Sequence, residues 1–237
     1  MAGYNTHITV SSFLGVGVGA AAHFALGFTP VQAVLSGILT GIGGMLPDLD
    51  SQSGKPVREI SALTAAVAPL LMMRRLLVWG RDSDGAFLLA ILLYGLIRYG
   101  GASILAKISV HRGMFHSIPA MIIAGELTFL GYIHTDIKVK FLMGASIALG
   151  FLSHLILDEI WAVQWNGIKV KFNKFSGSAM KMFGPNWGPN IFCYGLMFTL
   201  TWGIFVDGGL NNQQAAQEEK EMVREARQIE KNESRIR

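Results

Sequence analysis

The residues best suited to bind a divalent metal occur in four short groups that lie far apart in the sequence. Imidazole nitrogens and carboxylate oxygens together suit zinc, manganese or iron, whereas magnesium and calcium favour oxygen ligands alone. The groups therefore predict a divalent metal site, with zinc as the first choice and manganese or iron as alternatives. They are His7, the turn from Leu46 to Asp50, the segment from His111 to Ser117, and the segment from Ser153 to Asp158.

The spacing within two of these groups indicates how their side chains point. His154 and Asp158 are four residues apart, so on a helix they share one face and can bind the same ion. His111 and His116 are five residues apart, and on a helix they would point about 140° away from each other. A loop or a helix end between two membrane segments therefore suits this second pair better.

The elements that must position these groups are membrane helices. Of the 237 residues, 51% are hydrophobic and only 15% are charged, and the mean hydropathy is +0.41. A soluble domain of this size would scatter more charge over its surface. A helix needs about 20 apolar residues to cross a bilayer, and at least about 17. We therefore predict an all-α, polytopic transmembrane bundle of about six or seven spans, with segments at 8–28, 31–46, 60–78, 86–106, 118–135, 141–160 and 191–207.

The order of these segments places all four groups on one membrane face, here called side A. Counting helices in sequence puts residues 1–7, 47–59, 107–117 and 161–190 on side A, and the intervening loops with the C-terminus on side B. The candidate ligands are therefore expected to meet at one end of the bundle. His23 lies sixteen residues beyond His7, and His134 lies at the side B end of its helix, so both are expected to be structural.

Several residues within the predicted spans indicate how the helices pack. Gly15, Gly19, Gly37 and Gly41 have the small-xxx-small spacing that lets two membrane helices approach closely, although they could also be apolar filler. Pro69 can kink the third segment because proline lacks a backbone donor. Arg98 and Glu126 lie at similar depth, and we predict an ion pair between them because unpaired charges within a bilayer are costly.

The rest of the composition excludes some functions. The net charge of +4 arises before residue 211, so the high pI does not indicate nucleic-acid binding. Cys193 is the only cysteine, which leaves no disulfide framework and no cysteine-based metal site. We divide the chain into a membrane domain at 1–210 and a charged tail at 211–237. The tail is either solvated and partly disordered or a helix that binds a partner.

The four groups resemble, in order, the motifs of the YdjM-like family of bacterial and archaeal membrane-bound metal-dependent hydrolases. The matching segments are Thr6-His7, the Leu-Pro-Asp-x-Asp turn at 46–50, the His-Arg-Gly-x-x-His-Ser loop at 111–117 and the Ser-His-Leu-x-Leu-Asp helix at 153–158. The resemblance implies a multi-spanning fold and a divalent-metal hydrolase. It implies as metal ligands His7, Asp48, Asp50, His111, His116, His154 and Asp158. The chain departs from the family at Met114-Phe115 and at Glu159-Ile160-Trp161, so its substrate pocket is expected to differ.

This ligand set predicts the chemistry of the site. Seven ligands exceed what one tetrahedral ion uses, so one or two ions are expected, with two the simpler arrangement if all bind. A metal-activated water would then hydrolyse an ester or phosphoester. We expect Arg112 to stabilise negative charge on the substrate, Ser117 to orient it, and Glu159 or a loosely held aspartate to move protons.

The position of the site predicts the kind of substrate. A site at the membrane surface favours a phospholipid, a polyprenyl phosphate or another amphiphile. Four side A lysines among apolar residues could hold an anionic headgroup, or they could simply anchor the protein at the interface. These lysines are Lys169, Lys171, Lys174 and Lys181.

Two other functions compete with hydrolysis. A metal- or proton-binding transporter or channel would need polar residues through the spans, and beyond Arg98 and Glu126 few occur. A metal-stapled scaffold would instead act through its tail. The chain is expected in the inner or plasma membrane, and the distribution of basic residues slightly favours a cytoplasmic tail.

Overall fold

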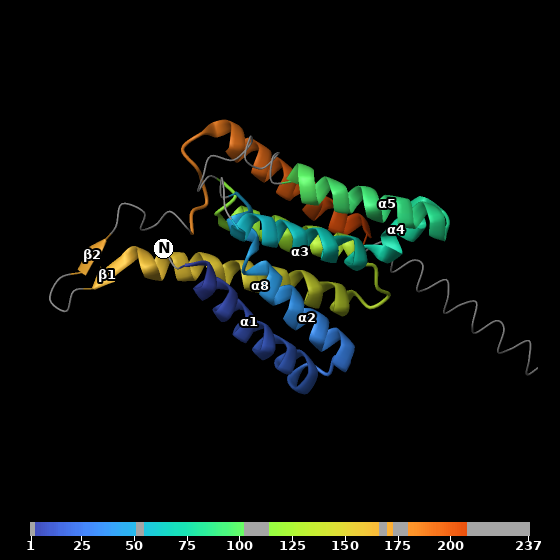
Figure 1. Cartoon of the computed structure of the whole chain (residues 1–237), viewed down its shortest axis with the longest axis horizontal. Helices are drawn as coiled ribbons and strands as arrows, with labels where there is room; N and C mark the ends of the chain where they lie inside the picture. Colours follow the sequence, from blue (N-terminus) through green and yellow to red (C-terminus); the bar gives the residue numbers. More distant parts are fainter. Residues whose placement is uncertain (1–2, 51–54, 102–113, 166–169, 173–179, 208–237) are drawn as a thin grey trace, which may run out of the picture.

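The computed structural model describes residues 3–50, 55–101, 114–165, 170–172 and 180–207, and helices dominate this part of the chain (Figure 1). The tail predicted at 211–237 lies outside it. The described elements are α1 (Tyr4–Ala20) with its continuation η1 (Ala21–Ala25), α2 (Pro30–Gly43), η2 (Leu46–Asp50), α3 (Lys55–Leu71), α4 (Met73–Gly80), α5 (Ser83–Gly95) with η3 (Leu96–Gly101), α7 (Ile118–Gly131), α8 (Ile137–Ala162), β1 (Val163–Trp165), β2 (Val170–Phe172) and a last helix, Trp187–Asp207.

Each predicted apolar segment corresponds to a helix, but not every helix is long enough to cross a membrane. Four qualify by length and hydropathy, and the bent pair α3 and α4 makes a fifth if it counts as one span. Helices α2 and α7 have 14 residues each and reach only about 21 Å, less than the roughly 30 Å hydrocarbon core. The prediction of six or seven spans is therefore not confirmed, and four or five candidate spans replace it within the described residues.

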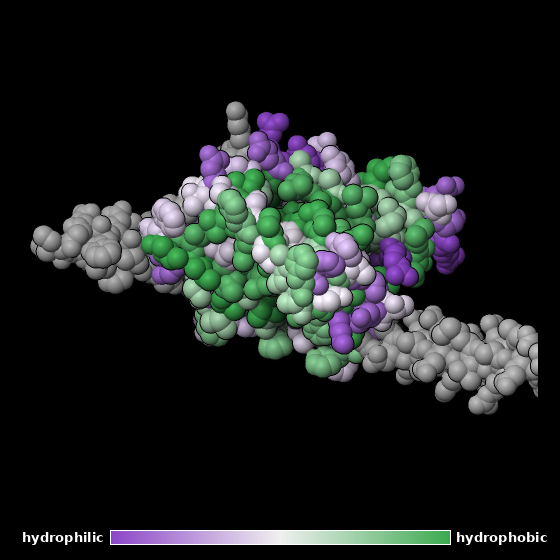
Figure 2. Space-filling model, turned by 90° about the horizontal axis from the view of Figure 1, so that it is seen from below, coloured by the Kyte–Doolittle hydropathy of each residue, from purple (hydrophilic) through white to green (hydrophobic). Residues whose placement is uncertain are grey.

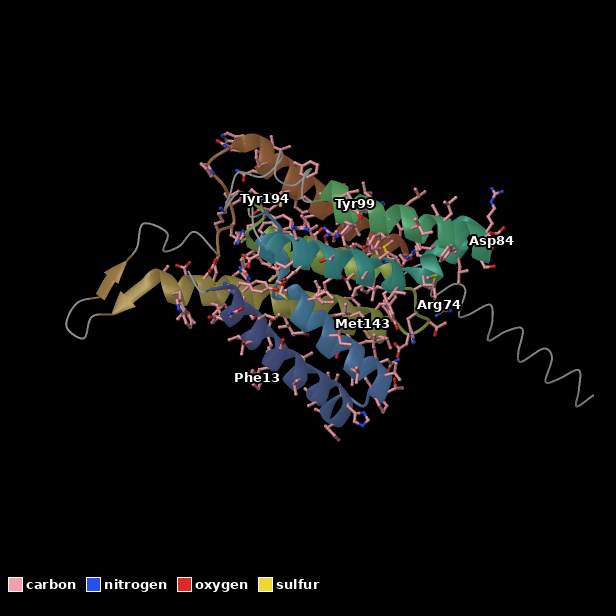
Figure 3. The ribbon with its side chains drawn as sticks, viewed as in Figure 1. Phe13, Arg74, Asp84, Tyr99, Met143 and Tyr194 are labelled. Carbon is pink, nitrogen blue, oxygen red and sulfur yellow. The ribbon has the colours of Figure 1, made fainter. Side chains whose placement is uncertain are left out.

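Lipid-facing surfaces agree with the membrane assignment. In Figure 2, apolar residues cover much of the visible face. Figure 3 shows Phe13 on the outer side of α1, whereas Met143 lies inside the bundle on α8. Phe13 is 75% exposed and Met143 is fully buried. Large exposed apolar side chains of this kind would make a soluble protein aggregate, but lipid covers them in a membrane.

Glycines bring α1, α2 and α8 into close contact, and they confirm the predicted packing of the first two helices. A Cβ atom on Gly37 would lie 2.8 Å from the carbonyl oxygen of Gly15, and one on Gly19 would lie 2.9 Å from that of Ala33. Gly150 of α8 lies closer still to α2, because a Cβ atom there would overlap the Thr40 carbonyl oxygen. The buried cluster beside these crossings consists of Leu39, Ile42, Val139, Met143 and Ile147.

Pro69 lies three residues before the break at Met72 between α3 and α4, and the two helices are bent by 62° there. The predicted kink is therefore present. The all-α class also holds, with one addition: β1 and β2 form a short antiparallel pair after α8, in which Val163 lies opposite Phe172. The two histidines expected to be structural bind backbone atoms, His23 at the Phe28 carbonyl and His134 at the Asp136 amide.

The predicted ion pair between Arg98 and Glu126 was wrong. Glu126 of α7 instead forms a hydrogen bond with Thr201 on the last helix, and the Arg98 guanidinium lies 5.5 Å from the centre of the Tyr99 ring. The reason is the position of the last helix, which packs against α7 and offers a hydroxyl group at the depth of Glu126. A partly buried ion network lies elsewhere, at the opposite end of the bundle, where Asp207 bridges Arg75 and the fully buried Lys140.

Candidate metal centre

Five of the seven predicted ligands come together at one buried point on side A. They arrive from four places in the chain: α1 supplies His7, η2 supplies Asp48, the residue two before α7 is His116, and α8 supplies His154 and Asp158. Their ligand atoms form two overlapping groups, each within 4.8 Å, namely His7 with His154 and Asp158, and Asp48 with His116 and His154. The helix order thus does bring distant imidazoles and carboxylates to a common site.

His154 is the centre of this cluster. Its Nδ1 atom lies 2.8 Å from the Gly44 carbonyl oxygen, and because a carbonyl only accepts, Nδ1 must carry the proton. The other nitrogen, Nε2, lies 3.7 Å from Asp48 Oδ1 and 3.9 Å from Asp158 Oδ2. Within the described residues this Nε2 atom has no hydrogen-bond partner. Metal-binding histidines show the same arrangement, with one ring nitrogen held by a carbonyl and the other facing the ion.

The other two histidines surround the same point. The His7 ring stacks on the His154 ring with centroids 3.6 Å apart, and its Nε2 atom lies 3.3 Å from Asp158 Oδ1. His116 meets His154 edge to face at 5.6 Å. Neighbouring ligands of a tetrahedral ion with bonds near 2.1 Å lie about 3.3 to 3.4 Å apart. The His7 to Asp158 separation fits that edge, whereas the stacked His7 and His154 rings, whose planes differ by 11°, must turn before both can direct a lone pair at one ion.

Burial separates the cluster into a closed and an open side. The side chains of His7, His154 and Asp158 are at most 3% exposed, whereas that of Asp48 is 25% exposed. Burying several ionisable groups together is costly unless they share a cation or compensating hydrogen bonds. The donor set and the Nε2 atom of His154 that faces two carboxylates fit a divalent metal, and Asp48 is the more exposed of the two carboxylates.

Two glycines hold His154 in place, and the sequence analysis missed them. A Cβ atom on Gly44 would lie 2.7 Å from Ser11 Oγ, and one on Gly150, four residues before His154, would lie 2.8 Å from the Gly44 nitrogen. The carbonyl that orients His154 therefore sits where α1, α2 and α8 cross without side chains between them. The Gly43-Gly44 pair just before the Leu46 to Asp50 turn was the feature of the sequence that could have predicted this close crossing.

Apolar residues close the space around the cluster. Met114 is buried, and Phe115 packs against the cluster of Met45, Leu49 and Ile60. The departure from the family pattern at these two positions is thus accounted for by packing, since both side chains fill space beside His116. Phe151 and Leu155 on α8 form a second apolar cluster with Ala120.

The remaining predicted site residues have other positions. Ser117 is fully buried and caps α7: its hydroxyl donates to the Met114 carbonyl and accepts from the Ala120 amide at 3.3 Å. These contacts fix the start of α7 beside His116, and the predicted contact of Ser117 with a substrate stays a prediction. Glu159 follows Asp158 on α8 and is half-buried. His111, Arg112 and the side chain of Asp50 lie outside the described residues, so their predicted roles stay predictions.

Comparison with known proteins supports the resemblance noted from the motifs. The profile of the YdjM inner membrane protein family matches residues 1–212, a range that contains all four motif groups and ends close to the predicted start of the charged tail. No curated protein and no solved structure shows significant similarity to the chain.

Proposed function

The chain belongs to the YdjM inner membrane protein family, and from this premise we propose that it is a membrane-embedded, metal-dependent hydrolase of an ester or phosphoester. The observation that carries the proposal is the environment of His154. One ring nitrogen is fixed by the Gly44 carbonyl, and the other faces two carboxylates without a hydrogen bond among the described residues.

His154 also limits how an ion would be held. An imidazole nitrogen has a single lone pair and so binds one ion, yet both candidate groups use His154. We therefore propose one ion anchored at His154 Nε2, held by His7 and Asp158 on its buried side and by His116 on the other, with the Asp48 carboxylate beside its open position. The mixed nitrogen and oxygen donors favour zinc, with manganese or iron as alternatives. A second ion stays a prediction, since it would need ligands from residues that are not described.

The chemistry then divides between the ion and the chain. A bound divalent ion would supply an acidified water molecule and would polarise the oxygen of the scissile bond. Asp48 is the one partly exposed carboxylate of the cluster, so we propose that its side chain accepts the proton from the attacking water. Asp158 and His7 are closed off from solvent and hold fixed positions rather than transferring protons. The general base contributes typically 10²- to 10⁴-fold to such a reaction.

A structural metal that staples the helices is the competing function, and one observation favours it. Most of the cluster is almost completely buried, as in closed structural zinc sites, whereas catalytic sites keep one position open. The exposure of Asp48 favours catalysis instead. The two functions differ in what happens when Asp48 alone is changed.

The experiment compares turnover and folding in three variants. Purified protein in lipid nanodiscs is assayed for hydrolysis of phospholipids and isoprenoid phosphates, with and without a chelator. We expect Asp48→Asn to lower turnover at least about a hundredfold while the protein keeps its metal and its melting temperature. His154→Ala should lose both metal and turnover, and His134→Ala, on side B, serves as the control. A purely structural metal is indicated if Asp48→Asn leaves turnover unchanged and chelation unfolds the protein.

A further inference from the structure

The segment at residues 180–190, here called the arm, docks directly beside the candidate metal centre. The Ile118 amide donates to the Lys181 carbonyl at 3.2 Å, and Ser117 pairs with Lys181 as a short parallel bridge. Ser117 follows His116, which is one of the clustered imidazoles. The backbone of the arm therefore lies one residue from the site, although the mechanism above gives it no role.

Hydrogen bonds fix the fold of the arm and join it to the last helix. Asn190 is buried, and its side-chain amide accepts from the Gly184 nitrogen at 2.8 Å and donates to the Gly184 oxygen at 2.9 Å. The Tyr194 hydroxyl donates to the Met182 carbonyl at 2.9 Å. Gly184 also faces the Met114 side chain, which precedes His116 by two residues. The arm is thus tied to the last helix on one side and to the site on the other.

The arm presents large apolar side chains outward at the end of a candidate span. Phe183 is 69% exposed and stacks on Tyr194, and Trp187 is 80% exposed at the first residue of the last helix. Figure 3 labels Tyr194 on this helix. Exposed aromatic residues at a span end lie at the level of the lipid headgroups. Lys181 adds a positive charge where the arm meets α7, and a positive charge at this depth attracts anionic headgroups.

We propose that the arm is the substrate-docking surface of the site, and that its ligand is a bilayer lipid with a phosphate headgroup. The apolar chain of the lipid packs against Phe183 and Trp187, and the headgroup lies between Lys181 and the exposed side of the cluster. The inference rests on the proposed function, because it gives that hydrolase its substrate class. A simple interfacial anchor would have the same exposed aromatics but no reason to pair with the backbone at Ser117 and Ile118, directly after His116.

The test compares a lipid substrate with a soluble one. The double variant Phe183→Ala/Trp187→Ala is assayed on phosphatidylglycerol in nanodiscs and on bis(4-nitrophenyl) phosphate, a water-soluble phosphodiester. We expect KM for the lipid to rise at least about tenfold, since two aromatic contacts with the apolar chain of the lipid are lost. Turnover of the soluble ester should stay within about twofold. The matched control is Phe198→Ala/Phe205→Ala, which removes two aromatics that are equally exposed on the same helix, further from the site. Equal effects of the two double variants on lipid turnover would overturn the inference.

A binding measurement keeps the inference testable without hydrolysis. Protein delipidated and then exposed to equal amounts of phosphatidylglycerol and phosphatidylcholine is analysed by native mass spectrometry. We expect selective retention of the anionic lipid, lost in Lys181→Gln and in the arm variant. No selectivity, or selectivity unchanged in both variants, would refute the docking surface. Lipid selectivity without turnover of either ester, even with added metal, would instead refute the proposed function and leave the arm as a lipid site.

Discussion

Replacing Gly150 by alanine should weaken metal binding although residue 150 touches no metal ligand. A methyl group there would overlap the Thr40 carbonyl oxygen and lie 2.9 Å from its carbon and 2.8 Å from the Gly44 nitrogen. Carbon contacts are optimal near 3.5 to 4.0 Å, so α2 and α8 must separate by about 1 Å. The hydrogen bond from His154 to Gly44, now 2.8 Å, would stretch beyond bonding range.

The expected result is a loss of metal affinity larger than the loss of stability. Losing the group that orients a metal-binding histidine typically costs 10- to 100-fold in affinity, while overpacking of this size costs about 1 to 3 kcal/mol. Affinity is measured by competition with a chromogenic chelator, on protein shown to be folded by circular dichroism. The control is Gly41→Ala on α2, where a Cβ atom meets nothing within 4 Å. The reasoning fails if folded Gly150→Ala binds metal as tightly as the Gly41 variant.

Three other outcomes follow from contacts elsewhere in the bundle. Glu126→Gln should keep the hydrogen bond to Thr201, whereas Glu126→Ala should lose about 0.6 to 1.7 kcal/mol in unfolding by denaturing detergent; equal stability of the two variants would contradict this. Asp207→Asn leaves the buried Lys140 without its carboxylate and should lower the free energy of unfolding by about 3 to 5 kcal/mol. Adding Lys140→Met should restore most of that stability, and a double variant no more stable than Asp207→Asn would rule out the pairing. Chelation should lower the melting temperature of the parent protein and leave that of His154→Ala unchanged; an equal drop in both would disconnect the metal from His154.

The helices and the meeting of the ligands could be predicted because both depend on long apolar runs. The up-and-down order of the apolar helices puts residues 1–7, the turn after α2 and the start of α7 at the same end of the bundle, and this order requires no knowledge of side-chain contacts. The membrane assignment needed only composition. The number of spans was harder to predict. The segments of α2 and α7 look like longer apolar spans in the sequence, but the two helices end at Gly43 and Gly131.

The details that failed depend on which helices are neighbours. Glu126 was paired with Arg98 by depth alone, but the last helix brings Thr201 to it. The sequence analysis also did not identify Ser117 as the N-cap of α7, although a serine before Ile118-Pro119 is a common helix start. The role of Gly44 could not be predicted, because it depends on the backbone carbonyl and not on a side chain. That carbonyl orients His154 only because α2 packs closely against α8.

Metal content is the most direct test of the central claim that His154 anchors one ion. Protein purified without chelators is analysed by inductively coupled plasma mass spectrometry, alongside His154→Ala and His134→Ala. The account predicts one transition-metal ion per chain in the parent protein and in His134→Ala, and none in His154→Ala. Metal retained equally by all three proteins, or absent from all three after incubation with zinc, manganese and iron, would contradict it.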